Sequence, residues 1–287
     1  MKIVTNDYGC GTSSSILDYD IKDVVIASEN NYEHVFDVED DLFFIGHDFL
    51  FYLWDNEEKF KKWSQRSQKY EHWLWCFERI DAIVPAWQHK SHISLSIASK
   101  FCRRILACDE DDCDKYGFDW LPQWASRKFY DLREYPINQE SKILFSGQAG
   151  IPEYQMRNEL LSKISSDDDL KNKIDITNTK RTFSWESYIQ NFLSYKTILN
   201  PVGILRGLNT RAYEAIYSGR LLLQHAIGTY TRHERMLRNN ENVIFFRDYN
   251  DLKEITKFDY EKILDPEKSF NEHSIFSRMK MIGIDIK

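Results

Sequence analysis

Arg211 and Glu214 stand three residues apart at the start of a predicted helix, directly after Asn209 and Thr210. A helix N-terminus offers unpaired backbone N–H groups and a partial positive charge, which suits a phosphate. Asn209 and Thr210 can cap this terminus, and Arg211 adds a planar cation suited to a diphosphate. Glu214, one turn further on, can accept both hydroxyls of a ribose. Because an arginine in the first turn opposes the helix dipole, its position favours a ligand-based role.

An ordinary structural interpretation of the same residues stays open. An Arg–Glu pair on a helix surface, with Gly219 as the C-terminal cap, needs no ligand. The spacing alone does not choose between the two interpretations.

The second half of the chain predicts a parallel α/β domain that would position these residues. Short apolar runs alternate with amphipathic segments, which is typical of βαβ units. Ser184 is expected to open one of the helices as its N-cap. The carboxyl ends of the strands should meet at one edge of the sheet, where such folds bind ligands. Strands are predicted at 142–148, 173–178, 197–202, 221–225 and 242–248, and helices at 152–164, 184–196, 210–219, 230–239 and 251–258.

The first half predicts a second α/β domain of less regular pattern. Residues 126–140 are polar, contain a proline and lack periodicity, so they predict a linker between the domains. The predicted domains are therefore 1–125 and 141–257. The polar tail at 258–287 is left unassigned, with packing against the first domain as one option. Strands are predicted at 1–6, 23–28, 40–46, 72–78 and 104–110, and helical segments at 49–70 and 92–102.

The segment Leu208–His225, LNTRAYEAIYSGRLLLQH, resembles the R-x-x-E-A-x-x-x-G-x-L-L-L segment of GT-B nucleotide-sugar glycosyltransferases. Within glycosyltransferase group 1 it is most similar to the spore-maturation-type branch. The resemblance extends from about Leu121 to about Lys257, whereas the N-terminal half is similar only in architecture. Four further stretches agree with this branch in order and position: Trp120–Leu132, Lys142–Ile164, Tyr188–Val202 and His233–Thr256.

The resemblance implies a GT-B architecture, in which two Rossmann-like domains with parallel sheets face a central cleft. It also implies transfer of a sugar from a nucleoside-diphosphate sugar to an acceptor hydroxyl, with retention and with no metal or other cofactor. Glu214 corresponds to the second glutamate of the group's Glu–seven residues–Glu pair, which implies a contact with the ribose. Arg206 occupies the position of the first glutamate, and is either a phosphate contact or a loop cation.

The leaving diphosphate of such a reaction needs positive charge, for which we predict Arg211 and Arg206. Arg157 is a phosphate contact by the resemblance and a surface charge otherwise. His89, which the sequence places at a loop-to-helix entry, is either a contact for the donor sugar and its developing charge or an exposed loop residue.

Two glycine-containing loops follow predicted strands and are candidate nucleotide contacts. Ser146 and Gly147 lie in FSGQAG, and Gly11 and Thr12 lie in YGCGTSSSI. Small residues let the backbone approach a nucleotide closely. A tight turn without a ligand is the alternative for both loops, and without the resemblance it is the favoured interpretation of FSGQAG. His225 closes a predicted strand, where the following loop would face the nucleobase. Asp7 and Glu78 are candidates for a catalytic base only because they follow strands.

The composition limits the classes of function. A net charge of -7 provides no general field for nucleic acid, and the five cysteines lack the paired spacing of a zinc site. With no signal peptide and no long apolar run, we expect a cytoplasmic protein with reduced thiols. Two alternatives to a transferase with a glycan or protein acceptor stay open. One is a non-catalytic accessory protein that binds a nucleotide or sugar, and the other is a glycosyltransferase acting on modified nucleic acid bases.

Overall fold

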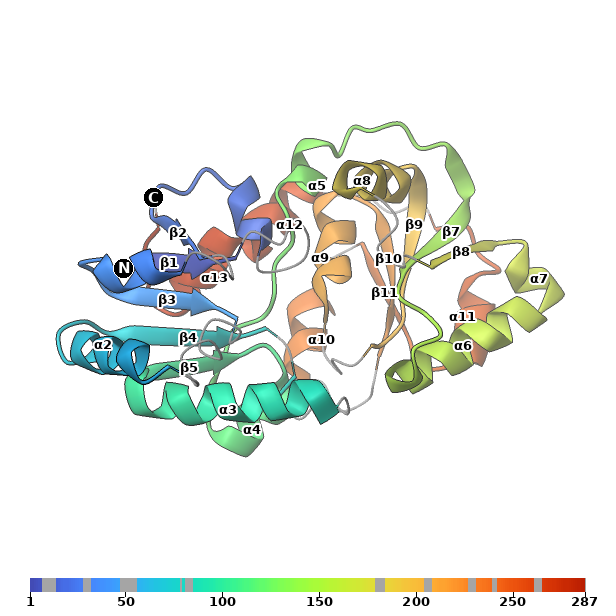
Figure 1. The fold of residues 1–287 in the computed structure, drawn as a ribbon. Helices are drawn as coiled ribbons and strands as arrows, with labels where there is room; N and C mark the ends of the chain where they lie inside the picture. Colours follow the sequence, from blue (N-terminus) through green and yellow to red (C-terminus); the bar gives the residue numbers. More distant parts are fainter. Residues whose placement is uncertain are drawn as a thin grey trace. The chain divides into compact units, whose positions relative to one another are not determined.

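The chain forms two compact units in this computed structural model, which describes residues 1–6, 14–27, 32–46, 56–77, 79–80, 85–178, 184–203, 208–226, 231–238, 242–260 and 265–286. The first unit combines Met1–Gln123 with Ile275–Lys287, and the second is Trp124–Ser274 (Figure 1). Each unit contains one sheet, and every strand pair is parallel. The predicted α/β class is therefore confirmed.

The described residues of the first unit form a six-stranded sheet in the order β2-β1-β3-β4-β5-β6. Trp63 and Ile97 pack from helices α2 and α3 against Phe44 and Leu74 of the sheet. The strands are β1 (Lys2–Thr5), β2 (Val24–Ile26), β3 (Leu42–Ile45), β4 (His72–Cys76), β5 (Arg104–Ala107) and β6 (Asp119–Trp120). The helices are η1 (Ser14–Asp18), η2 (Glu33–Asp37), α2 (Glu57–Ser67), α3 (Pro85–Phe101), α4 (Glu110–Tyr116) and α13 (Ile275–Met281).

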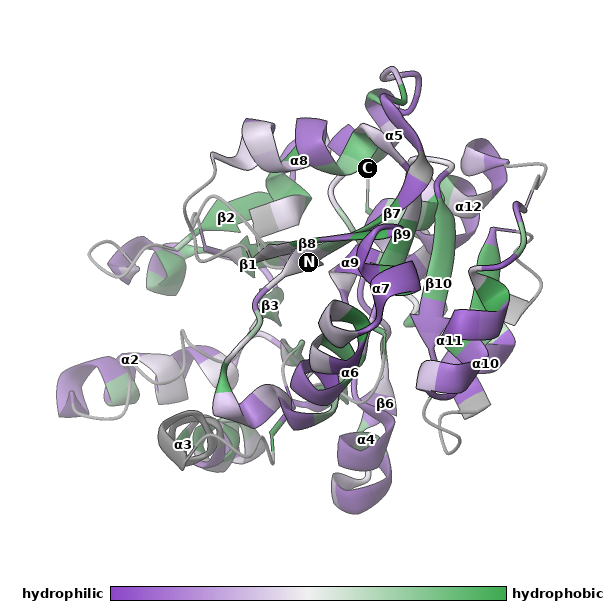
Figure 2. Ribbon diagram, turned by 90° about the vertical axis from the view of Figure 1, so that its right-hand side faces the viewer, coloured by the Kyte–Doolittle hydropathy of each residue, from purple (hydrophilic) through white to green (hydrophobic). Residues whose placement is uncertain are grey.

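The described residues of the second unit form a five-stranded sheet in the order β11-β10-β9-β7-β8. Figure 2 shows most of β10 apolar and the outer helix α7 largely hydrophilic. The strands are β7 (Gln139–Gly147), β8 (Ile174–Asn178), β9 (Tyr195–Asn200), β10 (Leu221–His225) and β11 (Val243–Phe246). The helices are α5 (Lys128–Asp131), η3 (Pro152–Tyr154), α6 (Gln155–Ser166), α7 (Asp168–Lys171), α8 (Trp185–Leu193), α9 (Thr210–Tyr217), α10 (Thr231–Arg238), α11 (Tyr249–Ile255) and α12 (Pro266–His273).

Alternation along each strand supplies the second unit with a core on either face of its sheet. Leu144 packs in one cluster with α5, α8 and α9, and Phe145 packs in the other with α6, α7 and α11. The same division separates Leu222 from Leu223 on β10. Successive side chains of a strand point to opposite faces, so a continuous apolar run serves both cores.

Two segments differ from the sequence interpretation. The predicted linker contains α5, whose Phe129 is fully buried, and its end already belongs to β7. The strand predicted at 104–110 ends at Ala107, and Glu110 already begins α4, because Asp109 caps the helix and acidic residues lie in its first turn, where the dipole favours them. The tail divides between the units, since α12 belongs to the second and α13 to the first.

The tail helix α13 is a core element of the first unit. Ile275 and Met279 are fully buried, and Arg278 donates from Nε to the carbonyl of Gln123 at 3.4 Å. Arg104 of β5 donates to the carbonyl of Ile282 at 3.0 Å, directly after the helix. The core of the first unit is thus completed by residues from the far end of the chain.

The burial of Phe129 predicts that the segment between the sheets is part of the second core. Truncation of a buried phenylalanine removes transfer free energy and leaves a cavity, so we expect Phe129→Ala to lower the free energy of unfolding by about 3–5 kcal/mol. Leu132→Ala is the matched control, because Leu132 is 44% exposed in the same segment. Urea denaturation of both variants checks this, and equal small losses would contradict it.

Candidate anion-binding site

Polar residues of the candidate site lie at the carboxyl ends of three neighbouring strands in the second unit. Strand β7 ends at Gly147, β9 at Asn200 and β10 at His225, and because the strands are parallel these ends share one edge of the sheet. Helix α9 begins beside this edge. Its N-cap is Asn209, whose side chain accepts from the backbone N–H of Arg211 at 3.1 Å. Thr210 is the first helical residue.

Arg211 is held at this edge by a neutral partner. Its Nη1 donates to Oδ1 of Asn200 at 3.0 Å, and its guanidinium lies 5.3 Å from the centre of the Phe145 ring. The absence of a side chain at Gly147 makes room for it, because a Cβ there would lie 2.1 Å from Nη2 of Arg211. The buried Nε of Arg211 has no hydrogen-bond partner.

Arg157 approaches the same ring from α6. The resemblance treated it as a phosphate contact or a surface charge, but it is only 4% exposed. Its Nη1 donates to the carbonyl of Gln148 at 2.9 Å, and its guanidinium lies 4.3 Å from the Tyr154 ring and 5.8 Å from the Phe145 ring. Gly203 provides the space, since a Cβ there would lie 2.5 Å from Nη2.

The two guanidiniums place positive charge at this edge of the sheet, and no carboxylate among the described residues forms a salt bridge with them. Burial and, as a smaller cause, the charge of Arg211 together lower the pKa of Arg157 to about 9. Arg157 is still protonated at neutral pH. Buried charges are normally paired, so two unpaired cations indicate a site for an external anion.

Glu214 is a candidate counter-charge for Arg211, but near neutral pH it carries only part of a negative charge. It is 5% exposed, and its Oε2 accepts from the hydroxyl of Tyr188 at 2.6 Å. Burial raises the pKa of Glu214 to about 7, although the Tyr188 hydrogen bond and the charge of Arg211 oppose this shift. Near neutral pH the carboxyl is thus only partly ionised. Tyr188 was not found from the sequence, because nothing in its spacing distinguishes it from a core aromatic residue.

Two more predicted residues lie at this edge, and each has a buried polar atom without a hydrogen-bond partner. The hydroxyl of Ser146 is fully buried and has no hydrogen-bond partner. His225 is 7% exposed and stacks on Phe246, with 4.9 Å between the ring centres. Its Nε2 lies 3.0 Å from the carbonyl of Arg247. Since a carbonyl only accepts, Nε2 carries the proton, and the unpartnered Nδ1 is an acceptor in the neutral ring. Burial lowers the pKa of His225, which favours that neutral form.

The remaining predicted residues are not placed. Gly11, Thr12 and Arg206 lie outside the described residues, as do Asp7 and Glu78. His89 lies in helix α3, but its side chain is outside the described part. Their roles stay predictions.

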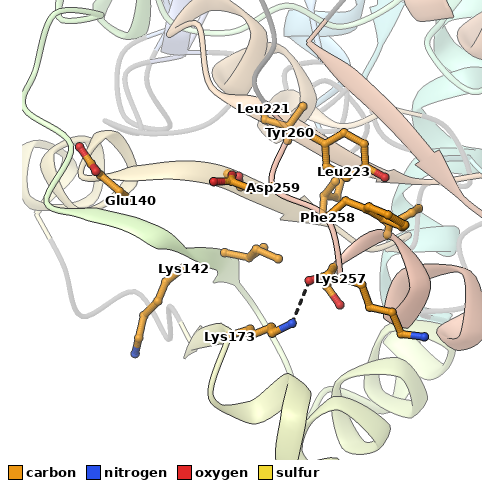
Figure 3. Close-up of a pocket in the computed structure, with 13 residues that line it drawn as sticks. Glu140, Lys142, Lys173, Leu221, Leu223, Lys257, Phe258, Asp259 and Tyr260 are labelled. Atoms are coloured by element: carbon orange, nitrogen blue, oxygen red, sulfur yellow. Dashed lines mark hydrogen bonds between the residues drawn. The ribbon is translucent and has the colours of Figure 1, made fainter.

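A pocket of about 270 Å³ lies elsewhere on the second unit, near the amino-terminal ends of the strands (Figure 3). Three lysines line it, but each already has a partner. Lys142 pairs with Asp175 at 2.8 Å, Lys257 pairs with Glu254 at 2.5 Å, and Lys173 donates to the carbonyl of Thr256 at 2.9 Å. This pocket therefore offers an anion less unpaired charge than the edge that carries Arg157 and Arg211.

The raised pKa of Glu214 predicts a pH-dependent stability. An unfolded glutamate ionises near 4.5, so between pH 4.5 and about 7 the folded state keeps a proton that the unfolded state has lost. Stability is highest below this window and falls as the pH rises through it, by about 3 kcal/mol for this group. Glu214→Gln lacks the titration and keeps an acceptor for Tyr188.

Urea unfolding of the wild type and Glu214→Gln at about pH 5 and about pH 8 measures this contribution as a difference between the two proteins. Glu159→Gln, which removes an exposed carboxylate on α6, is the control. If the difference between wild type and Glu214→Gln does not change with pH, Glu214 is not a titrating buried group.

Comparisons with known proteins add no assignment to this geometry. Among the described residues, no helix is both long and apolar enough to cross a membrane, and no group of three or more His, Cys, Asp or Glu side chains could hold a metal ion. No protein-family model and no curated protein matches the chain.

Proposed function

We propose that this protein is a glycosyltransferase that moves a sugar from a nucleoside-diphosphate sugar to an acceptor hydroxyl. One observation carries the proposal: the guanidiniums of the buried Arg157 and the partly buried Arg211 meet at the Phe145 ring, at the carboxyl edge of a parallel sheet, without a carboxylate salt bridge among the described residues. The resemblance around Arg211 and Glu214 agrees with it. The acceptor class is left open among a glycan, a protein and a modified nucleic acid base.

The proposed reaction needs positive charge more than it needs a nucleophile. When the bond between the anomeric carbon and the diphosphate oxygen breaks, the electron pair stays on that oxygen, and the acceptor oxygen forms the new bond to carbon. Fixed cations aimed at the leaving oxygens lower the barrier because they need not reorganise during the reaction. Arg157 and Arg211 are fixed in this sense, since neutral groups hold them. A retained anomeric configuration is implied by the resemblance.

The nucleoside part of the donor would lie beside Glu214 in this proposal. Tyr188 occupies Oε2, so a ribose hydroxyl would use the remaining acceptor positions of the carboxylate. The neutral His225 ring adds an acceptor at Nδ1, which suits a hydroxyl or an N–H group of the donor. Ser146 adds a hydroxyl at the end of β7.

A nucleotide-binding protein without turnover is the second candidate. The observation that favours it is that the described site contains cations and hydrogen-bonding groups of the donor half only, and that Arg206 stands where the related pattern has its first glutamate. Slow hydrolysis of the bound donor separates the two candidates. A transferase releases nucleoside diphosphate from its donor without an acceptor, whereas a binding protein releases none.

Removal of either arginine should weaken donor binding without unfolding the chain. Charge-assisted hydrogen bonds to phosphate are strong, so we expect Arg157→Gln and Arg211→Gln each to weaken nucleoside diphosphate binding by roughly 10- to 100-fold. Arg127→Gln is the control, because Arg127 is an exposed arginine of the same unit, paired with Asp131. Isothermal titration calorimetry with uridine, guanosine and adenosine diphosphates measures the effect. No binding of any of them by folded wild type would overturn the proposal.

Gly147 gives a test that leaves both cations in the chain. Because the atom that a new Cβ would meet is the flexible end of Arg211, we expect Gly147→Ala to displace the guanidinium rather than unfold the sheet. Nucleoside diphosphate affinity should fall by roughly 10-fold, with a loss of stability of about 1 kcal/mol or less. A variant that binds as tightly as the wild type would show that the position of Arg211 does not matter.

A further inference from the structure

Behind Arg211, the cross-strand pair Asn200 and Gln224 forms a buried line of hydrogen bonds. The two residues are direct register partners on β9 and β10 and are 1% and 3% exposed. Nδ2 of Asn200 donates to Oε1 of Gln224 at 2.7 Å, and Nε2 of Gln224 donates to the carbonyl of His225 at 3.0 Å. Their neighbours on the same strands are leucines of the core, Leu199 and Leu223. A buried amide pair next to such residues is costly unless its hydrogen bonds are made.

The line of hydrogen bonds can run in one direction only. At one end Arg211 has donors and no acceptor, so Asn200 must turn its oxygen toward it. At the other end the carbonyl of His225 only accepts, so Gln224 must turn its nitrogen there. The remaining groups, Nδ2 of Asn200 and Oε1 of Gln224, then face each other as donor and acceptor. Both ends therefore fix the same orientation of the two amides, and this orientation presents a neutral oxygen to the cation.

We propose that Asn200 and Gln224 are positioning residues that aim Arg211 at the bound anion while leaving its charge unpaired. The inference rests on the proposed anion site and extends it to two residues that touch no ligand. A carboxylate in the place of Asn200 would hold the same guanidinium nitrogen, but it would also neutralise it. An apolar residue in the place of Gln224 would leave Asn200 free to turn its NH₂ group toward Arg211. The amide pair avoids both outcomes.

Asn200→Asp is the decisive variant, because a carboxylate can still hold the guanidinium of Arg211 in place but neutralises the charge that an anion would bind. The new carboxylate keeps an acceptor for Nη1 and adds the counter-charge that the cation lacks, but it loses the Nδ2 donor to Oε1 of Gln224. We expect the affinity for inorganic pyrophosphate to fall by about 10-fold or more, while the urea midpoint changes little because the new ion pair offsets the lost hydrogen bond. A purely structural role for Asn200 predicts a lower midpoint and unchanged affinity. Asn172→Asp, which adds the same charge at the exposed end of α7, is the control.

A double-mutant cycle tests whether Asn200 acts through Arg211. In the Arg211→Gln background, Asn200→Asp should change pyrophosphate affinity by less than about 2-fold, because the group it neutralises is absent. Gln224→Leu is the second variant, and should weaken binding by about 3- to 10-fold in the wild type and little in Arg211→Gln. It keeps the inference testable if Asn200→Asp fails to fold.

The outcomes separate this inference from the proposed function. If the wild type binds pyrophosphate and Asn200→Asp binds it as tightly, or if the effects of Asn200→Asp and Arg211→Gln are additive, the positioning role is wrong and the anion site stands. If folded wild type binds neither pyrophosphate nor any nucleoside diphosphate, the proposed function fails, and the positioning role fails with it.

Discussion

The repulsion between the guanidiniums of the buried Arg157 and the partly buried Arg211 is the interaction on which the candidate site depends. Arg157 and Arg211 share the Phe145 ring, and the charge of one lowers the pKa of the other. Neutral groups hold one guanidinium nitrogen of each arginine, namely the carbonyl of Gln148 for Arg157 and the amide oxygen of Asn200 for Arg211. Such partners hold the cations in place but leave the electrostatic cost of burying them, which an anionic ligand would offset. Partial protonation of Glu214 near neutral pH weakens this nearby carboxylate as an internal counter-charge.

The strands contribute only their last residues to the polar site, so the apolar residues before them remain available to the two cores. In β7 the apolar residues Leu144 and Phe145 precede Ser146 and Gly147, and in β10 the three leucines precede Gln224 and His225. The apolar parts enter the two cores, while the polar ends meet at one edge. Glycine at 147 then leaves the space that a side chain of α9 fills. In these strands the apolar residues stabilise the fold, and the polar residues that follow them contribute to the candidate site.

Local patterns predicted the second unit well, because its signals are short in range. Alternating apolar runs indicated the parallel sheet, and Ser184 caps α8 as expected, accepting from the N–H of Ser187 at 3.2 Å. Three features escaped because they depend on contacts distant in sequence. The linker prediction failed to include Phe129, whose burial requires α8 and α9 to be in place. Tyr188 meets Glu214 across 26 positions of the chain, and the Asn200–Gln224 pair exists only once the strand register is known.

The placement of α13 determines an order of events during synthesis. Ile275 and Met279 complete the core of the first unit, yet they are translated only after the whole of the second unit. Domains generally fold as units while the chain emerges. The first unit must therefore wait, with part of its apolar surface uncovered, until residues beyond the second unit leave the ribosome. The second unit, whose residues are contiguous, has no such delay, and so the chain acquires its candidate anion site before the core of the first unit is complete.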